Sequence, residues 1–227
     1  MTGDAGISTD LDAGGLNLRV PPSPRFRVST IGLDFEIQAQ NEGFCFVAGV
    51  DEVGRGCLAG PVVAAACILD PAKPLPKGLN DSKKLTAKRR EAITEELKGT
   101  VLAYSIARIE AEVIDEINIL EATKRAMCLA ISNLRPQADF LLIDALQLKQ
   151  ISLPQKAIIG GDAISASIAA ASILAKTFRD ALMTEYDLEF PQYGFASHKG
   201  YGAAVHLEAL RSNGPCLLHR KTFRGVL

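Results

Sequence analysis

The chain has 227 residues, enough for one α/β domain with a buried core or for one domain with a small appendage. Hydrophobic residues make up 48% and charged residues 22%, an ordinary soluble globular composition, and the longest apolar run, 62–69, is far too short to span a bilayer. The net charge of −1 excludes binding of nucleic acid through overall positive charge, so any attraction to phosphate must be local.

The N-terminal residues differ in composition from the rest of the chain. Residues 1–32 are rich in Gly, Asp, Ser, Thr and Pro and cannot bury much apolar surface, so we expect a disordered extension. Residues 33–227 are expected to form one domain. It begins with a short helix over 33–40 and ends in a helical part over about 187–227.

Apolar runs and helical patterns alternate along this domain. Strands are predicted, in chain order, over 44–51, 62–69, 101–109, 139–144 and 157–159. Helices are predicted over about 86–98, 121–134 and 164–186 and within 202–212, and Thr86 is suited to cap the first of them. Early strands joined by a tight turn, followed by strands separated by helices, predict an α/β fold with a mixed sheet covered by helices.

The five cysteines are odd in number and include no Cys-x-x-Cys pair. Cys45 and Cys67 lie in apolar runs and are predicted to be small core residues, which suits a reducing compartment. The N-terminus lacks the basic and apolar segments of a secretory signal. We therefore expect a cytoplasmic protein that does not bind membranes, and we expect it to be a monomer.

Acidic residues follow three of the predicted strands. Asp51 and Glu52 end the first, Asp144 ends the strand over 139–144, and Asp162 follows the strand over 157–159 through two glycines. If the first and fourth strands are adjacent and parallel, Asp51 and Asp144 lie side by side at one end of the sheet.

Clustered carboxylates repel one another unless a cation neutralises them, and oxygen ligands without His or Cys suit Mg²⁺ or Mn²⁺. Two such ions can promote in-line displacement at a phosphodiester. Any single acid of this kind is more often a helix cap or a turn former. The hypothesis of a metal site therefore depends on three acidic segments occurring together.

Other polar clusters suggest contacts with a nucleic acid. Glycines on both sides of Arg55 let the backbone approach a ligand and bond a ribose 2′-hydroxyl, although Gly-x-Gly is most often only a turn. Tyr201, between two glycines, is suited to stack on a sugar or base, or to pack as an ordinary loop residue. Residues 73–90 carry seven Lys and Arg against one acid, which favours phosphate binding or a solvated helix start. Candidate phosphate contacts are Arg55, Lys83, Lys84 and Lys176.

The three histidines form no recognisable metal motif. His198, His206 and His219 are not spaced like zinc ligands, and we interpret none of them as a ligand.

Seven short blocks occur in a characteristic order along the chain. They are VDEVGRG (50–56), LAGPVV (58–63), GLNDSKKL (78–85), SIAAASILAK (167–176), FPQYGF (190–195), HKGY (198–201) and HRKTF (219–223). In these blocks the chain resembles the type 2 ribonucleases H, and specifically bacterial ribonuclease HII, over about 44–223. So many blocks in order make the resemblance highly specific.

The resemblance implies a ribonuclease H-like fold, with a five-stranded mixed sheet, flanking helices and a C-terminal helical extension. It implies an endonuclease that hydrolyses the RNA strand of RNA–DNA hybrids and cuts 5′ to ribonucleotides embedded in duplex DNA. The cut leaves 5′-phosphate and 3′-hydroxyl ends and starts the removal of ribonucleotides from DNA. The catalytic and metal-binding residues that it implies are Asp51, Glu52, Asp144 and Asp162.

The resemblance also implies how ribose is recognised. The backbone of Gly54, Arg55 and Gly56, together with Tyr201, is expected to sense the 2′-hydroxyl at the RNA–DNA junction. Three positions depart from the family pattern: Cys57 replaces a proline, Ala145 with Leu146 replaces a Gly-Asn pair, and Gly160 replaces a lysine. The last change removes one cation near the acids.

Two alternatives come from other functional classes. One is a different ribonuclease H-like nuclease, such as a DNA resolvase or transposase core, and the predicted ribose sensing opposes it. The other is a non-catalytic binder of RNA–DNA hybrids. Retention of all four acids opposes that reading, because acids that face phosphates without a metal weaken binding.

Overall fold

The computed structural model describes residues 31–227, so nearly all of the predicted N-terminal extension lies outside the described residues. The strands are β1 (Val47–Val53), β2 (Val62–Ile68), β3 (Ala103–Ile109), β4 (Phe140–Asp144) and β5 (Gln155–Ile158). The helices are α1 (Asp34–Asn41), α2 (Ala87–Thr100), α3 (Ala111–Ile117), α4 (Ile119–Ser132), α5 (Ala166–Glu189), α6 (Phe195–His198) and α7 (Ala204–Asn213). Single 3₁₀ turns lie at Ser82–Lys84, Gly161–Ala163 and Pro191–Tyr193.

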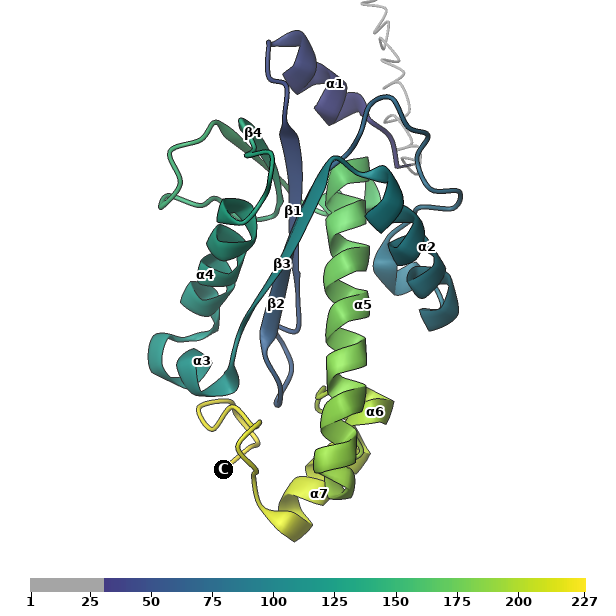
Figure 1. Ribbon diagram of the computed structural model, residues 1–227. Coiled ribbons are helices and arrows are strands. Elements are labelled where there is room, and N and C mark those ends of the chain that lie inside the picture. The colour runs from purple at the N-terminus through teal and green to yellow at the C-terminus, as the bar shows by residue number, and fades with distance from the viewer. Residues whose placement is uncertain (1–30) are drawn as a thin grey trace, which may run out of the picture.

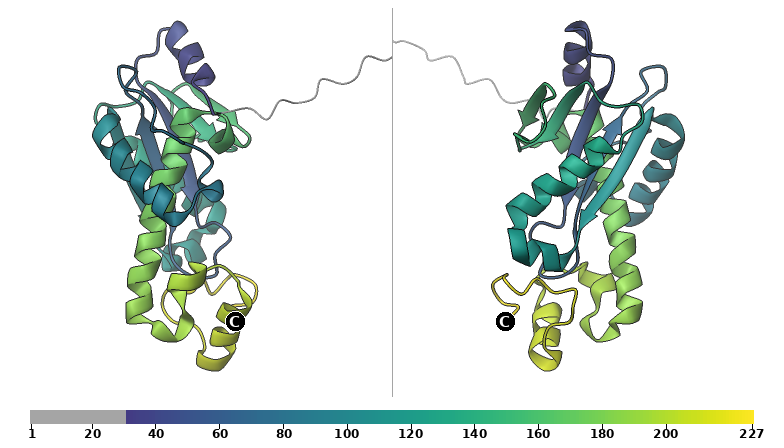
Figure 2. Two further views of the ribbon diagram at one scale, coloured as in Figure 1. Left: turned by 90° about the vertical axis from the view of Figure 1, so that its right-hand side faces the viewer. Right: turned by 60° about the vertical axis from the view of Figure 1, so that its left-hand side comes forward.

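The five strands form one mixed sheet in the order β3-β2-β1-β4-β5, which confirms the predicted α/β class. β1, β2 and β3 pair antiparallel, whereas β4 pairs parallel with β1 and with β5. Helices α3 and α4 lie on one side of the sheet, and α2 and α5 lie on the other (Figure 1). The C-terminal segment, with α6 and α7, packs beside the end of α5 and beyond the strand ends at the turn between β1 and β2 (Figure 2).

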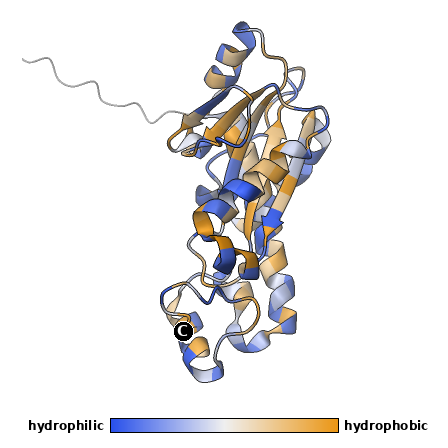
Figure 3. Ribbon diagram, turned by 90° about the vertical axis from the view of Figure 1, so that its left-hand side faces the viewer, coloured by the Kyte–Doolittle hydropathy of each residue, from blue (hydrophilic) through white to orange (hydrophobic). Residues whose placement is uncertain are grey.

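Hydrophobic cores fill both faces of the sheet. Alternate residues of β2 point to opposite faces, so Ala64 and Ala66 join the core under α4, whereas Val63 and Ala65 join the core under α2 and α5. The strands accordingly are mainly hydrophobic in Figure 3, while the helices mix hydrophobic and hydrophilic residues. Burial on both faces explains why β2 is a continuous apolar run.

The contact between α5 and β1 is unusually close. A Cβ atom added at Gly49 would overlap the backbone of Ser167 and Ile168, so only glycine lets the helix lie this near the strand. The first half of α5 is mostly Ala and Ser, which keeps the facing surface small. This contact fixes the start of α5, and with it the turn Gly161–Ala163, against the middle of β1.

The predicted elements agree with the structure to within a few residues. Thr86 caps α2, since its hydroxyl accepts a hydrogen bond from Arg89 N, as expected. Helices α3 and α6 were not predicted because each is too short to show a helical period. The prediction that Cys45 is a core residue is wrong: Cys45 is exposed because it precedes β1, whereas Cys67 is buried.

Helix hydropathy bears on membrane insertion. Within residues 31–227 no helix combines the length and the hydrophobicity needed to cross a bilayer. The location in the cytoplasm stays a prediction.

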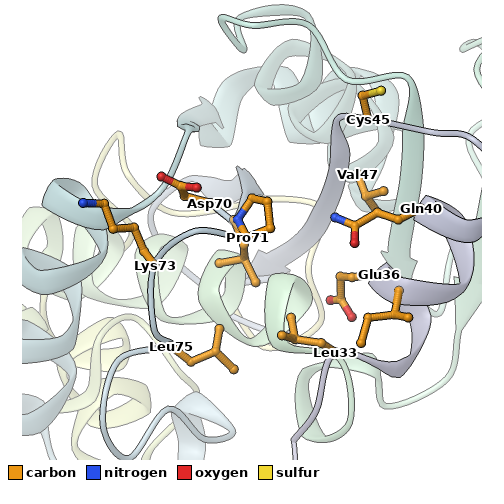
Figure 4. A pocket seen from close by; sticks show the side chains of 11 residues that line it. Leu33, Glu36, Gln40, Cys45, Val47, Asp70, Pro71, Lys73 and Leu75 are labelled. Carbon is orange, nitrogen blue, oxygen red and sulfur yellow. The ribbon is translucent and has the colours of Figure 1, made fainter.

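A cavity lies at the end of β1 opposite Asp51. Its walls come from α1, the start of β1 and the loop that follows β2, as Figure 4 shows. The buried carboxylate of Glu36 accepts hydrogen bonds from the hydroxyls of Ser165 and Ser167 and from Ser167 N, and so ties α1 to α5. None of the predicted site residues lines this cavity.

Replacing Gly49 with alanine tests the helix–strand contact. We expect a loss of about 1–3 kcal/mol or more in the free energy of unfolding, because α5 must move away from β1. Gly99→Ala is the control: this glycine is in α2 with no atom within 4 Å of an added Cβ, and alanine there is expected to stabilise by up to about 1 kcal/mol. Urea denaturation measures both, and equal stabilities would contradict the contact.

Candidate active site

The pairing of β1 with β4 brings two of the predicted acids to the same end of the sheet. Val50 stands opposite Ile143, so the next residues, Asp51 and Asp144, emerge together. Glu52 follows Asp51 on β1. Asp162 lies in the turn between β5 and α5, and the backbone N–H of its neighbour Gly161 donates to Asp144 Oδ1 at 2.8 Å.

Burial and mutual repulsion disfavour the ionised acids. Asp51 is 4% exposed, and its burial together with the charge of Glu52 holds its pKa well above the ordinary value. Burial also raises the pKa of Glu52, against the opposing effect of Arg55. Burial and the charge of Asp162 raise the pKa of Asp144. A cation at this end of the sheet would relieve the repulsion.

Two cationic side chains contact the acids. Lys83 Nζ lies 3.0 Å from Asp162 Oδ2, and an Arg55 guanidinium nitrogen lies 3.2 Å from Glu52 Oε1. The side chains of Lys83 and Arg55 are 77% and 42% exposed, so both can swing away from the acids into solvent. The other oxygen of Glu52, Oε2, is buried and has no hydrogen-bond partner among residues 31–227. A buried carboxylate oxygen without a donor is a position that suits a cation.

The acids do not form a finished ligand shell. In the part of the chain that the structure describes, no three His, Cys, Asp or Glu side chains are close enough together to hold one ion. Their charges nevertheless repel: Glu52 and Asp144 raise the pKa of Asp51, Asp144 raises that of Glu52, and Asp162 raises that of Asp144. The donor chemistry fits Mg²⁺ or Mn²⁺, while closing around an ion requires these side chains to turn away from Lys83 and Arg55.

The segment 54–56 is held by a buried arginine that sequence reasoning missed. Gly54 has a φ of 91°, and a Cβ there would overlap the guanidinium of Arg179. Arg179 is fully buried and donates to the carbonyls of Pro61, Lys199 and Ala59 at 2.8–3.0 Å. Buried guanidinium groups need such acceptors, and here they join the loop after β1 to the loop after α6.

Arg220 is a second fully buried arginine, and it also was not predicted. Its guanidinium donates to the carbonyl of Gly60 and, at 2.9 Å, to that of Arg55. Arg220 therefore fixes the backbone at the centre of the Gly54-Arg55-Gly56 segment. The only sequence signals were an arginine interrupting the apolar stripe of a helix and an arginine in the closing block.

Tyr201 lies in a loop that docks onto the same segment. The carbonyl of Gly200 accepts hydrogen bonds from Leu58 N and Ala59 N, and a Cβ at Gly200 would overlap the Ala59 carbonyl. Tyr201 itself is 42% exposed, and Lys176 Nζ lies 5.8 Å from its ring centroid. The structure thus places Tyr201 near the 54–61 loop with its ring accessible.

A hollow with basic walls runs past Tyr201 between α2 and α5. Lys83 and Lys176 line it, as does Lys199, which was not predicted. Lys84 does not line it and lies 3.8 Å from Asp81, while Arg55 points to Glu52. The roles of all of these side chains as phosphate contacts stay predictions.

The departures from the family pattern have local structural consequences. Cys57 is buried, with its Sγ 3.7 Å from the Lys199 carbonyl. Ala145 has a φ of 51°, in the left-handed region that glycine adopts at less cost. Gly160 has a φ of 66° and no atom near an added Cβ, so the position of the missing lysine faces open space.

Comparison with known proteins decides the family. The sequence model of the family Ribonuclease HII matches residues 48–226. The chain belongs to the ribonuclease HII family. It is 58% identical to the ribonuclease HII of Chlamydia caviae over 193 residues, covering 85% of this chain and 90% of the relative. It is 56% identical to that of Ruminiclostridium cellulolyticum over 191 residues, covering 84% and 74%.

The fold agrees with this family. The crystal structure of ribonuclease H2 from Pyrococcus horikoshii superposes with a TM-score of 0.69 at 26% identity, covering 80% of this chain and 95% of that chain. The predicted ribonuclease H-like fold is confirmed. The chain is a ribonuclease H enzyme, and ribonuclease HII enzymes cleave the RNA strand of RNA–DNA hybrids. Both alternatives, a resolvase core and a non-catalytic binder, lose their support.

Replacing Asp51 with asparagine tests the repulsion among the acids. We expect Asp51→Asn to melt at a higher temperature than the unaltered chain at pH 7 in chelator, by roughly 2–4 °C for each kcal/mol gained. A raised carboxyl pKa means that the unaltered chain loses stability as the pH rises from about 3.9 through the pKa of Asp51, and the amide removes this loss.

Asp162→Asn is the control for this melting experiment, because Asp162 is paired with Lys83 and its amide is expected to give no gain. Mn²⁺ is expected to raise the melting temperature of the unaltered chain more than that of Asp51→Asn. A lower melting temperature for Asp51→Asn in chelator would contradict the electrostatic description.

Proposed function

We propose that this ribonuclease H also cuts 5′ to single ribonucleotides embedded in duplex DNA, leaves 5′-phosphate and 3′-hydroxyl ends, and so starts the removal of ribonucleotides from DNA. The observation that carries the proposal is the docking of two loops, the Gly54-Arg55-Gly56 segment and the Tyr201 loop, beside the paired acids. A site that recognises a single ribose needs firmly held recognition groups close to the hydrolytic centre.

Asp51, Glu52, Asp144 and Asp162 are the residues that would hold divalent cations, Mg²⁺ or Mn²⁺. When bound, two such ions supply activation of the attacking water and stabilisation of the leaving 3′ oxygen. The all-oxygen donor set, the partnerless Glu52 Oε2 and the raised pKa values of three acids support this assignment. The chain's own contribution is to hold the carboxylates at one end of the sheet, next to where the phosphodiester would lie.

The ribose 2′-hydroxyl would be read by backbone groups of Gly54, Arg55 and Gly56 and by Tyr201. Gly56 supports this role because an added Cβ there meets nothing within 4 Å, so its backbone is open to a ligand. Arg179 and Arg220 hold both loops through main-chain carbonyls, and this keeps the recognition groups in place.

Lys83 and Lys176 would contact phosphates in the basic hollow, and Lys84 and Arg55 would do so from its margin. When a cation binds the acids, Lys83 would leave its ion pair with Asp162 and contact a phosphate instead. The proposal includes activity of the chain as a monomer.

A cleavage assay tests the proposal directly. Labelled duplex DNA with one internal ribonucleotide is incubated with the full chain in Mg²⁺, in Mn²⁺ and in chelator. We expect one cut 5′ to the ribonucleotide that requires a divalent cation, and no cut in the matched all-DNA duplex. Cleavage of the all-DNA duplex, or cutting of long hybrids alone, would refute the proposed substrate.

Substitutions then separate chemistry from recognition. Asp144→Asn is expected to lower the rate by more than about 10²-fold on every substrate, because several kcal/mol of metal-dependent stabilisation are lost. Tyr201→Phe is expected to slow cutting at a single ribonucleotide by roughly tenfold, the loss of one hydrogen bond to the ribose. Tyr104→Phe, an exposed tyrosine on β3, is the control. Unchanged rates in Tyr201→Phe and Tyr201→Ala would remove Tyr201 from the site.

A further inference from the structure

All three histidines of the chain lie in one cluster behind the Tyr201 loop, and the function described above uses none of them. The rings of His198 and His206 stack with centroids 4.4 Å apart, and those of His206 and His219 lie 5.2 Å apart. His206 and His219 are at most 1% exposed. Each ring nitrogen of a buried imidazole needs a hydrogen-bond partner, and the partners present here determine which nitrogen of each ring carries the proton.

The proton positions follow from the two ends of the series of hydrogen bonds that runs from Cys216 to Tyr201. Cys216 N–H can only donate, so His219 Nδ1 accepts it at 3.0 Å and the His219 proton is on Nε2. That Nε2 donates to His206 Nε2, 3.0 Å away, which leaves the His206 proton on Nδ1. His206 Nδ1 then donates to the carbonyl of Tyr201 at 2.8 Å. One set of tautomers satisfies every group.

His198 supports the same loop from its other side. Gly200 N–H donates to His198 Nδ1 at 3.2 Å, so His198 Nε2 donates to the Tyr193 carbonyl at 2.8 Å. The backbone N–H of Tyr201 donates to the His198 carbonyl. The His206 ring and the backbone N–H of Ala203 thus both bond the Tyr201 carbonyl, while the Tyr201 N–H is held by the His198 backbone.

Burial disfavours the charged forms of His206 and His219. Burial lowers the pKa of His206, and burial together with His206 lowers that of His219 to about 4. A second proton on His206 would be on Nε2 and would face the N–H of His219, whereas a second proton on His219 would be on Nδ1 and would face the backbone N–H of Cys216. The tautomer chain is thus intact at neutral pH.

The neighbouring residues His219 and Arg220 support both parts of the proposed ribose-recognition site, the Tyr201 loop and the 54–56 segment. His219 reaches the Tyr201 carbonyl through His206, while its neighbour Arg220 donates to the Arg55 carbonyl. The histidine pair therefore ends on the backbone of a tyrosine that is 42% exposed, in the loop that docks on the segment following β1.

We propose that His206 and His219 are positioning residues, which hold the Tyr201 backbone in register with the 54–56 segment and thereby set cutting at a single ribonucleotide. The inference rests on the proposed role of Tyr201. Misplacing a substrate-contacting group by about 1 Å can reduce a rate by up to 10²-fold, so loosening this anchor has a measurable effect.

The test compares two substitutions of His206 on duplex DNA with one ribonucleotide, at saturating substrate and divalent cation. His206→Phe keeps an aromatic ring against His198 and Phe195 but removes both hydrogen bonds, and we expect kcat to fall roughly tenfold. His206→Asn is the matched variant, because its amide N–H reaches about the position of Nδ1 and can still donate to the Tyr201 carbonyl. We expect it to keep most of the activity.

A double-mutant cycle separates positioning from stability. In a Tyr201→Ala background the side chain to be positioned is absent, so His206→Phe is expected to cause no further loss. Melting curves show whether each variant is folded at the assay temperature. If His206→Phe does not fold, His219→Gln, which can still donate to His206, is compared with His219→Leu, which cannot, in the same two backgrounds.

The outcomes distinguish this inference from the proposed function. Equal activity in the bonding and non-bonding variants, or the same loss with and without Tyr201, would overturn the positioning role while the substrate assignment stands. A parent chain that does not cut at a single ribonucleotide would contradict the proposed function, and the inference with it.

Discussion

Repulsion among carboxylates at one buried end of the sheet is the interaction on which the rest of the site depends. The core fixes it: Val50 and Ile143 are buried partners, so Asp51 and Asp144 cannot separate without breaking the pairing of β1 with β4. A one-residue slip of β1 would turn Asp51 into the hydrophobic core under α4. The close contact at Gly49 holds α5, and therefore Asp162, at the same end. The fold tolerates this electrostatic cost, which a bound cation would offset.

The recognition half of the site is built on the opposite principle, since its buried charges are fully satisfied. Arg179 and Arg220 donate hydrogen bonds to main-chain carbonyls of two loops that are far apart in sequence. The histidine chain adds a second support to Tyr201. Loops that carry specificity are often mobile, whereas here buried polar networks tie the two loops to each other. The acids and the residues proposed to recognise ribose thus lie on two adjoining surfaces.

The sequence predicted the parts of this arrangement that depend on local pattern. Apolar runs located all five strands. The carboxyl ends of two of them, β1 and β4, placed Asp51 beside Asp144, because these two strands are parallel neighbours. The strand-end pattern also marked Glu52 and Asp162 as candidate metal ligands, and the flanking glycines marked Tyr201 as a candidate for stacking. Their specific catalytic and ribose-sensing roles came from the family resemblance. Arg179 and Arg220 could not be found this way, since all their partners except Lys199 lie 118 to 165 residues away. The relative orientation of the four carboxylates also could not be predicted from the sequence pattern, because Glu52 turns toward Arg55 and Asp162 toward Lys83.

The most direct test of the central claim is to locate a cation at the acids. Crystals of the full chain soaked in Mn²⁺ would show the ion by its anomalous scattering. The electrostatic account predicts a peak in direct contact with Asp51 and Asp144, with Lys83 withdrawn from Asp162, and no such peak in Asp51→Asn. No peak at the acids, or a peak that persists unchanged in Asp51→Asn, would contradict it.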